Sequence, residues 1–147
     1  FIVDTGSVFD SYFCDFDRNY AFGFICDEAK KAYKVVFDAT DAGFNAAQVG
    51  KTTSDVYHAM NNVMQKGGAL GNSVGRLGHG LGLQLTEWPS NTATDNTLLK
   101  PGVILTLEPG MEYLSGKEMV HEENIVITEN GPEWLTKRAP EELPIIQ

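Results

Sequence analysis

Aromatic and β-branched residues dominate the beginning of the chain. They predict two strands, at about 1–5 and 12–22, because such residues favour a pleated, half-buried surface. We expect a turn between them at Gly6-Ser7, and Gly23 to end the second strand.

Two amphipathic helices are predicted next. Apolar residues recur at helical spacing over about 27–46, and Asp27 suits the positive end of that helix. A second apolar stripe predicts a helix at about 55–66, with Thr53 or Ser54 as its N-cap.

The second half of the chain is rich in glycine and alternates short apolar runs with turns. The apolar runs predict strands at about 79–86, 103–107, 119–128 and 133–136. Between and after them we expect a polar loop at 89–97, a hairpin turn at 129–131 and an extended tail at 139–147. Strands that flank two helices and follow one another through short turns indicate an α+β fold with a largely antiparallel sheet.

Composition narrows the class of protein. The 147 residues carry a net charge of −9, which argues against nucleic acid or an anionic membrane as a partner. No apolar run is long enough for a membrane helix, and no signal peptide opens the chain. Cys14 and Cys26 form no CxxC pair, which disfavours a thiolate zinc site and suits a reducing cytoplasm. Phe1-Ile2-Val3 has the pattern of a strand interior, so we expect native sequence upstream.

Several carboxylates occupy positions where the pattern calls for apolar residues. Asp4 closes an apolar strand, and Asp15 lies inside the next one. Two inward carboxylates on neighbouring strands repel each other unless a cation lies between them. Glu108 follows a buried apolar strand. A single Asp in a turn is more often a turn residue, so the prediction rests on the set.

A histidine and a further glutamate complete the set. His79 stands between two glycines, which allow close approach of backbone and ligand. Glu122 and Glu123 begin an apolar strand, and strand alternation allows only one of them to face inward. Carboxylates with one imidazole suit Mn²⁺, Fe²⁺, Co²⁺ or Zn²⁺, and two such ions can share bridging carboxylates.

Five short motifs now stand in a fixed order. They are Asp4-x-Gly6, Asp15-x-x-Arg18, Gly78-His79-Gly80-Leu81-Gly82, Leu107-Glu108-Pro109-Gly110-Met111, and Glu122 six residues before Thr128. In order and spacing this set resembles the creatinase/prolidase/methionine aminopeptidase family of metallohydrolases. The resemblance implies the α+β pita-bread fold, with residues 1–147 as the C-terminal portion of its catalytic domain.

The resemblance also implies a role for each residue. Asp4 would chelate one of two divalent metal ions, and Asp15 and Glu122 would bridge the pair. His79 and Glu108 would hold the second ion, and Glu108 would also shuttle a proton. The implied reaction is hydrolysis of a C–N bond, in which metal-activated water attacks a carbonyl carbon.

Two positions depart from the family pattern. The family commonly has His-Glu-x-Pro where this chain has Thr86-Glu87-Trp88-Pro89, and threonine cannot carry the positive charge of that substrate-binding histidine. Trp88 either lines the substrate pocket or is a surface or dimer-contact aromatic. Asp17 replaces a usual Thr or Ser, and it either lies beside the metals or is a solvated partner of Arg18.

Three functions remain open. The leading hypothesis is a Xaa-Pro peptidase or dipeptidase acting on small peptides. The second is a non-peptide member of the fold that acts on a small zwitterion, such as a creatinase-like or ectoine-hydrolase-like enzyme or a sulfonium lyase. The third is a binding module that has lost catalysis. The resemblance is compatible with a homodimer and with a cytoplasmic location.

Overall fold

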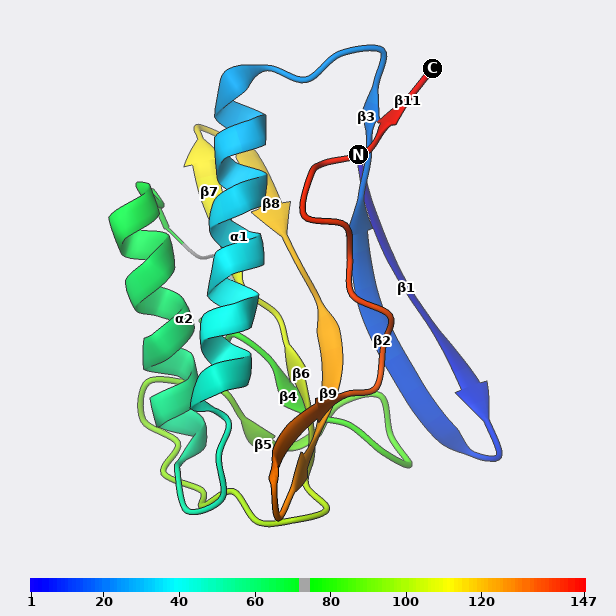
Figure 1. The fold of residues 1–147 in the computed structure, drawn as a ribbon, viewed down its shortest axis with the longest axis vertical. Helices are drawn as coiled ribbons and strands as arrows, with labels where there is room; N and C mark the ends of the chain where they lie inside the picture. The colour runs from blue at the N-terminus through cyan, green and yellow to red at the C-terminus, as the bar shows by residue number, and fades with distance from the viewer. Residues whose placement is uncertain (72–74) are drawn as a thin grey trace.

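The computed structural model describes residues 1–71 and 75–147 as helices packed beside short strands (Figure 1). The helices of this part of the chain are α1 (Asp27–Ala46) and α2 (Thr53–Gly67). Its strands are β1 (Ile2–Phe9), β2 (Tyr12–Asn19), β3 (Ala21–Phe22), β4 (His79–Gly80), β5 (Glu87–Ser90), β6 (Ile104–Leu107), β7 (Gly110–Leu114), β8 (Lys117–Val120), β9 (Glu123–Thr128), β10 (Gly131–Trp134) and β11 (Ile145–Ile146). The predicted α+β class is confirmed.

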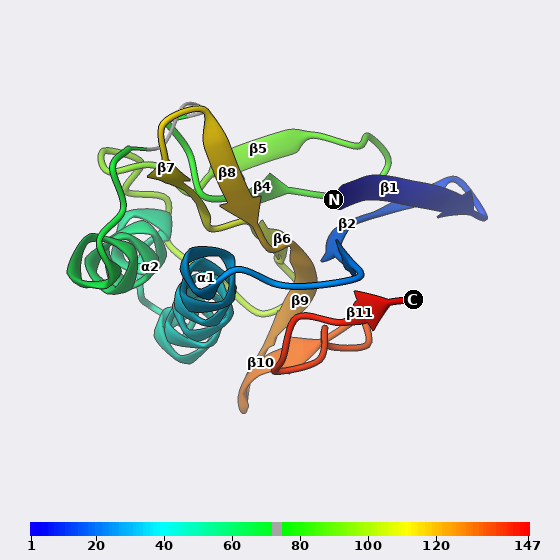
Figure 2. The same ribbon diagram turned by 90° about the horizontal axis from the view of Figure 1, so that it is seen from above.

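The central sheet has five strands in the order β10-β9-β6-β4-β5, and all of its pairings are antiparallel. Smaller pairs flank it: the β1–β2 hairpin, the β7–β8 hairpin and the parallel pair β3–β11. The helices lie on one side of β9, and the β1–β2 hairpin lies on the other (Figures 1 and 2). The hairpin and the sheet therefore face each other through side chains of β2 and β9.

Both helices form where the apolar periodicity predicted them. Helix α1 has the predicted bounds and packs against α2. Helix α2 begins earlier than predicted because Thr52, not Thr53 or Ser54, is its N-cap. The Thr52 hydroxyl accepts from the backbone N–H of Asp55, whose carboxylate accepts from the Thr52 N–H in return.

The core lies between the helices and the central sheet. Its fully buried side chains come from both helices and from the central strands. The largest apolar ones are Tyr33, Met60, Met64, Leu77, Leu99, Leu105, Leu107, Ile125 and Ile127.

The predicted turn at Gly6-Ser7 is wrong. Strand β1 continues to Phe9, and the turn lies at Asp10-Ser11, whose φ angles of 48° and 71° suit short polar residues. Gly6 has a different role, since a Cβ at this position would overlap the carbonyl oxygen of Cys14. The glycine therefore permits close approach of the two strands.

Two strand predictions in the glycine-rich half need correction. The strand predicted at 79–86 is only the two residues of β4, because the chain then leaves the sheet in a loop closed by the Glu87 carboxylate, which accepts from Gln84 N at 2.8 Å. Strand β5 then enters the segment 89–97, which was predicted to be a loop.

The strand predicted at 119–128 is divided into β8 and β9 by His121 and Glu122. The backbone N–H of His121 donates to the carbonyl of Pro109, in register with the β7–β8 pairing, so this end of β8 follows β7 and the central sheet is rejoined only at Glu123. Strand β7, which pairs with β8, was not predicted. The 129–131 turn and its return strand are present, and the return strand β10 begins at Gly131.

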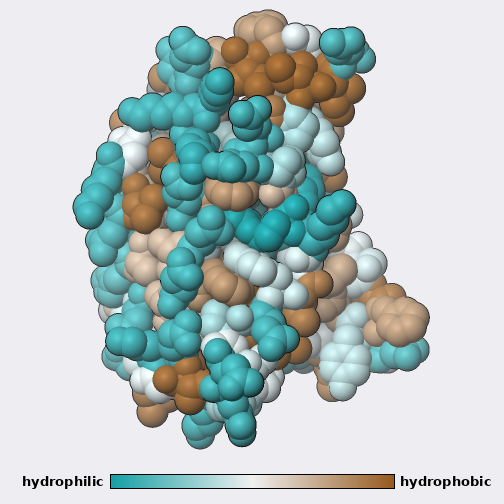
Figure 3. Space-filling view, viewed as in Figure 1, coloured by the Kyte–Doolittle hydropathy of each residue, from teal (hydrophilic) through white to brown (hydrophobic). Residues whose placement is uncertain are grey.

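In the part of the chain that the structure describes, no helix combines the length and apolar character needed to cross a membrane. Hydrophobic side chains gather on the surface near β3 and β11 (Figure 3). They include Phe1, Phe22, Phe24, Ile145 and Ile146.

Candidate metal centre

The β1–β2 hairpin places three carboxylates on one face. Asp4 stands directly opposite Asp17, and Asp15 lies two residues from Asp17. Opposed residues of an antiparallel pair share a face, as do residues i and i+2 of one strand. The hairpin therefore presents Asp4, Asp15 and Asp17 together toward the sheet.

The central sheet places an imidazole opposite these carboxylates. His79 is 2% exposed, and its Nδ1 lies 2.8 Å from the carbonyl oxygen of Gly80. A carbonyl oxygen only accepts, so Nδ1 carries the proton and Nε2 keeps a free lone pair. His79 Nε2 lies 3.8 Å from Asp15 Oδ2 and 4.0 Å from Glu122 Oε1. Burial lowers the pKa of His79, which favours the neutral, metal-binding form.

Two groups of side chains have metal-compatible geometry. One is Asp15, His79 and Glu122, and the other is Asp4, Asp17 and Glu122. Within each group the candidate ligand atoms lie within 4.8 Å of one another, and Glu122 belongs to both. Glu108 is in neither group, but with Asp4 and Asp17 it lines an adjoining cavity of about 190 Å³.

The electrostatics of this cluster favour the binding of a cation. Burial, together with the nearby carboxylates Glu108 and Asp15, raises the pKa of Glu122 to about 10. Burial and then Asp4 raise the pKa of Asp17 to about 7, and burial raises the pKa of Glu108. One carboxylate oxygen each of Asp17, Glu108 and Glu122 is buried without a hydrogen-bond partner among residues 1–71 and 75–147. Unpaired buried carboxylates are costly, so this donor set fits hard divalent cations.

Glu122 and Glu123 are distinguished as candidate metal ligands by their hydrogen-bond partners and not, as predicted, by strand alternation. Both side chains are buried, at 3% and 0% exposure, because the break between β8 and β9 turns Glu122 inward as well. The Glu123 carboxylate is fully engaged: it accepts from Arg18, Thr136, Arg138 and the backbone N–H of Ala139. Glu122 is the one left to face the cluster.

Asp17 is not a solvated residue paired with Arg18. The Arg18 guanidinium donates to the carboxylate of Glu123 and to the backbone carbonyls of Asp17, Glu122 and Lys137. The Asp17 side chain is 5% exposed, so it is not a solvated residue either. Arg18 instead ties the hairpin to the segments around Glu123.

Asn124 fixes the hairpin against β9. Its amide oxygen accepts from the backbone N–H of Asp15 at 3.1 Å, and its amide nitrogen donates to the Asp15 carbonyl. This two-point bond sets the position of Asp15 relative to Glu122. Asn124 was not predicted as a site residue, although it follows Glu122 by two residues in the strand predicted at 119–128.

Arg76 was also missed. It lines the carboxylate cavity, and its positive charge partly offsets the rise in pKa that burial causes at Glu108 and Asp15. Its position three residues before His79 was the feature of the sequence that could have identified it as a site residue. The cavity thus carries one cation among its acidic side chains.

His121 is a packing residue in this structure. It is 1% exposed, and its ring makes edge contacts with Tyr33 and Phe37 of α1 at centroid distances of 4.7 and 5.8 Å. Burial lowers its pKa to about 3. The ring therefore lies against the helix, not in either metal-compatible group.

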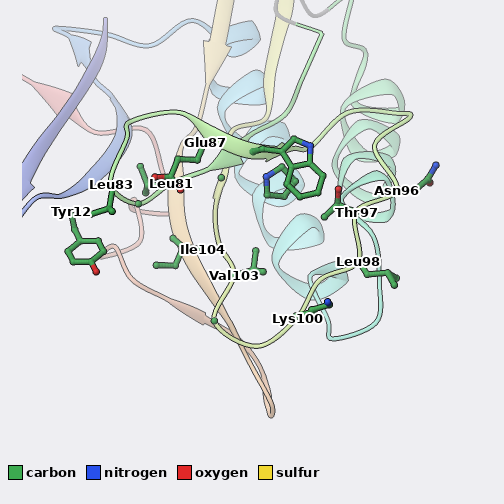
Figure 4. A pocket seen from close by; sticks show the side chains of 15 residues that line it. Tyr12, Leu81, Leu83, Glu87, Asn96, Thr97, Leu98, Lys100, Val103 and Ile104 are labelled. Atoms are coloured by element: carbon green, nitrogen blue, oxygen red, sulfur yellow. The ribbon is translucent and has the colours of Figure 1, made fainter.

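The Thr86–Pro89 stretch lies near a second, larger cavity. Glu87 and Trp88 line this cavity of about 780 Å³, and Trp88 is 73% exposed (Figure 4). Thr86 is exposed and lines neither cavity. The larger cavity contains none of the clustered carboxylates, whereas the smaller one is lined by Asp4, Asp17 and Glu108.

Comparison with known proteins places this arrangement in a family. The model of metallopeptidase family M24 matches residues 1–129. The chain is 30% identical over 136 residues to a Xaa-Pro dipeptidase of Pyrococcus furiosus, which covers 92% of this chain and 39% of the relative. It is 34% identical to an uncharacterized peptidase of Staphylococcus aureus, with 92% and 38% covered.

Solved structures share the fold. A dipeptidase from Pyrococcus horikoshii superposes with a TM-score of 0.91 at 34% identity, covering 99% of this chain and 40% of that one. The predicted pita-bread fold is therefore confirmed, and the chain spans about two fifths of the length of the relatives it matches. With its motifs, fold and clustered acidic side chains in agreement, the chain belongs to metallopeptidase family M24.

Proposed function

We propose that Asp4, Asp15, His79, Glu108 and Glu122 hold two divalent metal ions and that the protein hydrolyses the C–N bond of Xaa-Pro dipeptides. The observation that carries this proposal is Glu122, a buried carboxylate shared by two metal-compatible groups. The family and the Xaa-Pro dipeptidase relative support the reaction class.

Metal ions bound here would polarise the substrate carbonyl and acidify a water molecule. The protein's own groups supply proton transfer and positioning. Glu108 lines the cavity with a raised pKa, which suits a carboxyl group that takes a proton and passes it to the leaving nitrogen. His79 is held in one tautomer by Gly80, which keeps Nε2 oriented toward Asp15 and Glu122.

Arg76 suits the recognition of a dipeptide. A Xaa-Pro dipeptide ends in a free carboxylate, and Arg76 brings a guanidinium to the wall of the same cavity. Because Asp4, Glu108 and Glu112 on the same cavity wall repel a carboxylate, the Arg76 guanidinium is the group there that can attract it.

A non-peptide substrate is the second candidate, because Thr86 replaces the family histidine and lies exposed outside both cavities. The altered position fits a change of substrate within the family, such as to creatine or ectoine. The binding-module hypothesis is disfavoured, since all five ligand positions carry competent side chains.

The test begins with metal content. Elemental analysis of protein purified without chelator should give about two equivalents of Mn, Fe, Co or Zn per chain. Turnover of Ala-Pro, creatine and ectoine is then compared, with Glu122→Gln as the loss-of-function variant and exposed Glu129→Gln as its matched control. Hydrolysis of Ala-Pro that only Glu122→Gln abolishes supports the proposal. No metal after soaking with Mn²⁺ or Zn²⁺, or turnover of the zwitterions alone, contradicts it.

A further inference from the structure

Asp17 is the acidic residue of the cluster that the family pattern does not explain. It stands directly opposite Asp4 in the β1–β2 register, with Asp15 two residues away on the same face. Like charges directly opposed across an antiparallel pair destabilise it. A hairpin that keeps both carboxylates needs a compensating positive charge.

Among the described residues, no cationic side chain forms an ion pair with the Asp17 carboxylate, although Arg76 lines the same cavity. Arg18, the adjacent cation, reaches Asp17 only through the backbone carbonyl and gives its carboxylate contact to Glu123. The Asp17 side chain is 5% exposed, and its Oδ1 is buried without a hydrogen-bond partner among the described residues. A buried carboxylate without a partner is unfavourable, so an external cation is the consistent partner.

The geometry offers a place for that cation. Candidate ligand atoms of Asp4, Asp17 and Glu122 lie within 4.8 Å of one another. Oxygens that share one ion at about 2.0–2.2 Å lie at most roughly 4.4 Å apart, so small side-chain rotations would complete the site. Asp17 also lines the cavity beside Asp4 and Glu108, so an ion could reach it.

We propose that Asp17 is a sixth metal-binding residue, which gives the Asp4 side of the centre a third carboxylate. This inference rests on the proposed metal centre and extends it. Asp4, Asp17 and Glu122 offer oxygen atoms alone, whereas the neighbouring group includes the imidazole of His79. Carboxylate oxygens suit Mn²⁺ and Mg²⁺, and imidazole suits Zn²⁺, Fe²⁺ and Co²⁺. The two halves of the centre therefore differ in the ion that they prefer, and Asp17 adds one more carboxylate to the half that lacks the imidazole.

The test compares Mn²⁺ binding to metal-free protein by calorimetry and by the electron paramagnetic resonance of free Mn²⁺. Asp17→Asn keeps the shape of the side chain and removes its charge, and Asp17→Thr installs the residue usual in the family. Asp10→Asn removes the same charge from the exposed tip of the same hairpin, where asparagine tolerates the positive φ, and serves as the matched control.

We expect native protein and Asp10→Asn to bind two Mn²⁺ ions with the same affinities. Both Asp17 variants should bind one of the two ions at least about tenfold more weakly, because even residues outside the coordination sphere change metal affinity by about that factor. Metal-free Asp17→Asn should also unfold at a higher temperature than native protein at pH 8.5, because a repulsive charge is gone. A purely structural Asp17 predicts the opposite shift.

Native stoichiometry and affinity in both Asp17 variants would overturn the inference and leave the proposed function standing. Failure of native protein to bind a pair of ions would refute the proposed function itself. The two failures are therefore distinguishable in one titration series.

Discussion

Replacement of Glu123 by glutamine tests whether this residue is the structural glutamate of the pair. The Glu123 side chain is fully buried and lies 3.1 Å from Arg18 Nη2 and 3.3 Å from Arg138 Nη1. Both guanidinium groups are less than one fifth exposed, so water screens them only partly. An amide at position 123 can still accept from the backbone N–H of Ala139, but its NH₂ group would face an arginine.

The expected loss of stability is large. Breaking a buried ion pair from one side costs about 3–5 kcal/mol, because the remaining charge is left uncompensated. For a domain of this size each kcal/mol lowers Tm by about 2–4 °C, so Glu123→Gln should lower Tm by roughly 6–20 °C. Metal affinity should fall as well, since Arg18 also holds the backbone carbonyl of Glu122 at 3.1 Å.

The assay is thermal unfolding followed by circular dichroism in the presence of chelator, so that the loss of metal does not contribute. Glu133→Gln is the matched control, because it makes the same change at an exposed position on β10. If the two variants have equal Tm values within about 2 °C, a difference worth about 1 kcal/mol or less, the reasoning about Glu123 is refuted.

Three further predictions concern the site. Metal-free protein should lose stability as pH rises from about 4 toward 10, because Glu122 and Asp17, with pKa values of about 10 and 7, bind more protons folded than unfolded. Urea midpoints at pH 5 and pH 8 check the sign, and saturating Mn²⁺ should reverse it. Asn124→Ala removes both bonds to the Asp15 backbone, which should cost about 1–3 kcal/mol per unsatisfied group and weaken metal binding in a calorimetric titration. Asp15→Asn should abolish binding of the metal pair, since a bridge needs two anionic oxygens, and retention of two metals would contradict the assignment.

Secondary structure was predictable where local chemistry alone determines it. Helix α1 was predicted with its observed bounds, because its apolar stripe and acidic first turn are local signals. The turn of the first hairpin was not, because Gly6 looks like a turn residue and its real role is close contact with Cys14 on the other strand. Strand β5 was missed because Pro89 argues against a strand, while the structure accommodates it after a cis peptide bond.

In the candidate site, too, residue types and spacing could be read from the sequence, but contacts between distant segments could not. The types and spacing of the carboxylates identified which residues to consider. The sequence could not show that Glu123 is neutralised by Arg18 and Arg138 while Glu122 is not, because those partners come from opposite ends of the chain. Asp17 likewise had two readings until its burial was known.

The division of the site between the hairpin and the sheet has a consequence for folding. Asp4 and Asp15 belong to the first strands of the chain, and Glu122 belongs to the last third. An ion held by these residues acts as a removable cross-link that closes a loop of most of the polypeptide. Such a closure restricts the unfolded ensemble in the way that a long-range disulfide does, and the restriction grows with loop length. Amide hydrogen exchange in β1 and β2 should therefore slow when metal is added, so that the exchange rate of the hairpin indicates whether metal is bound.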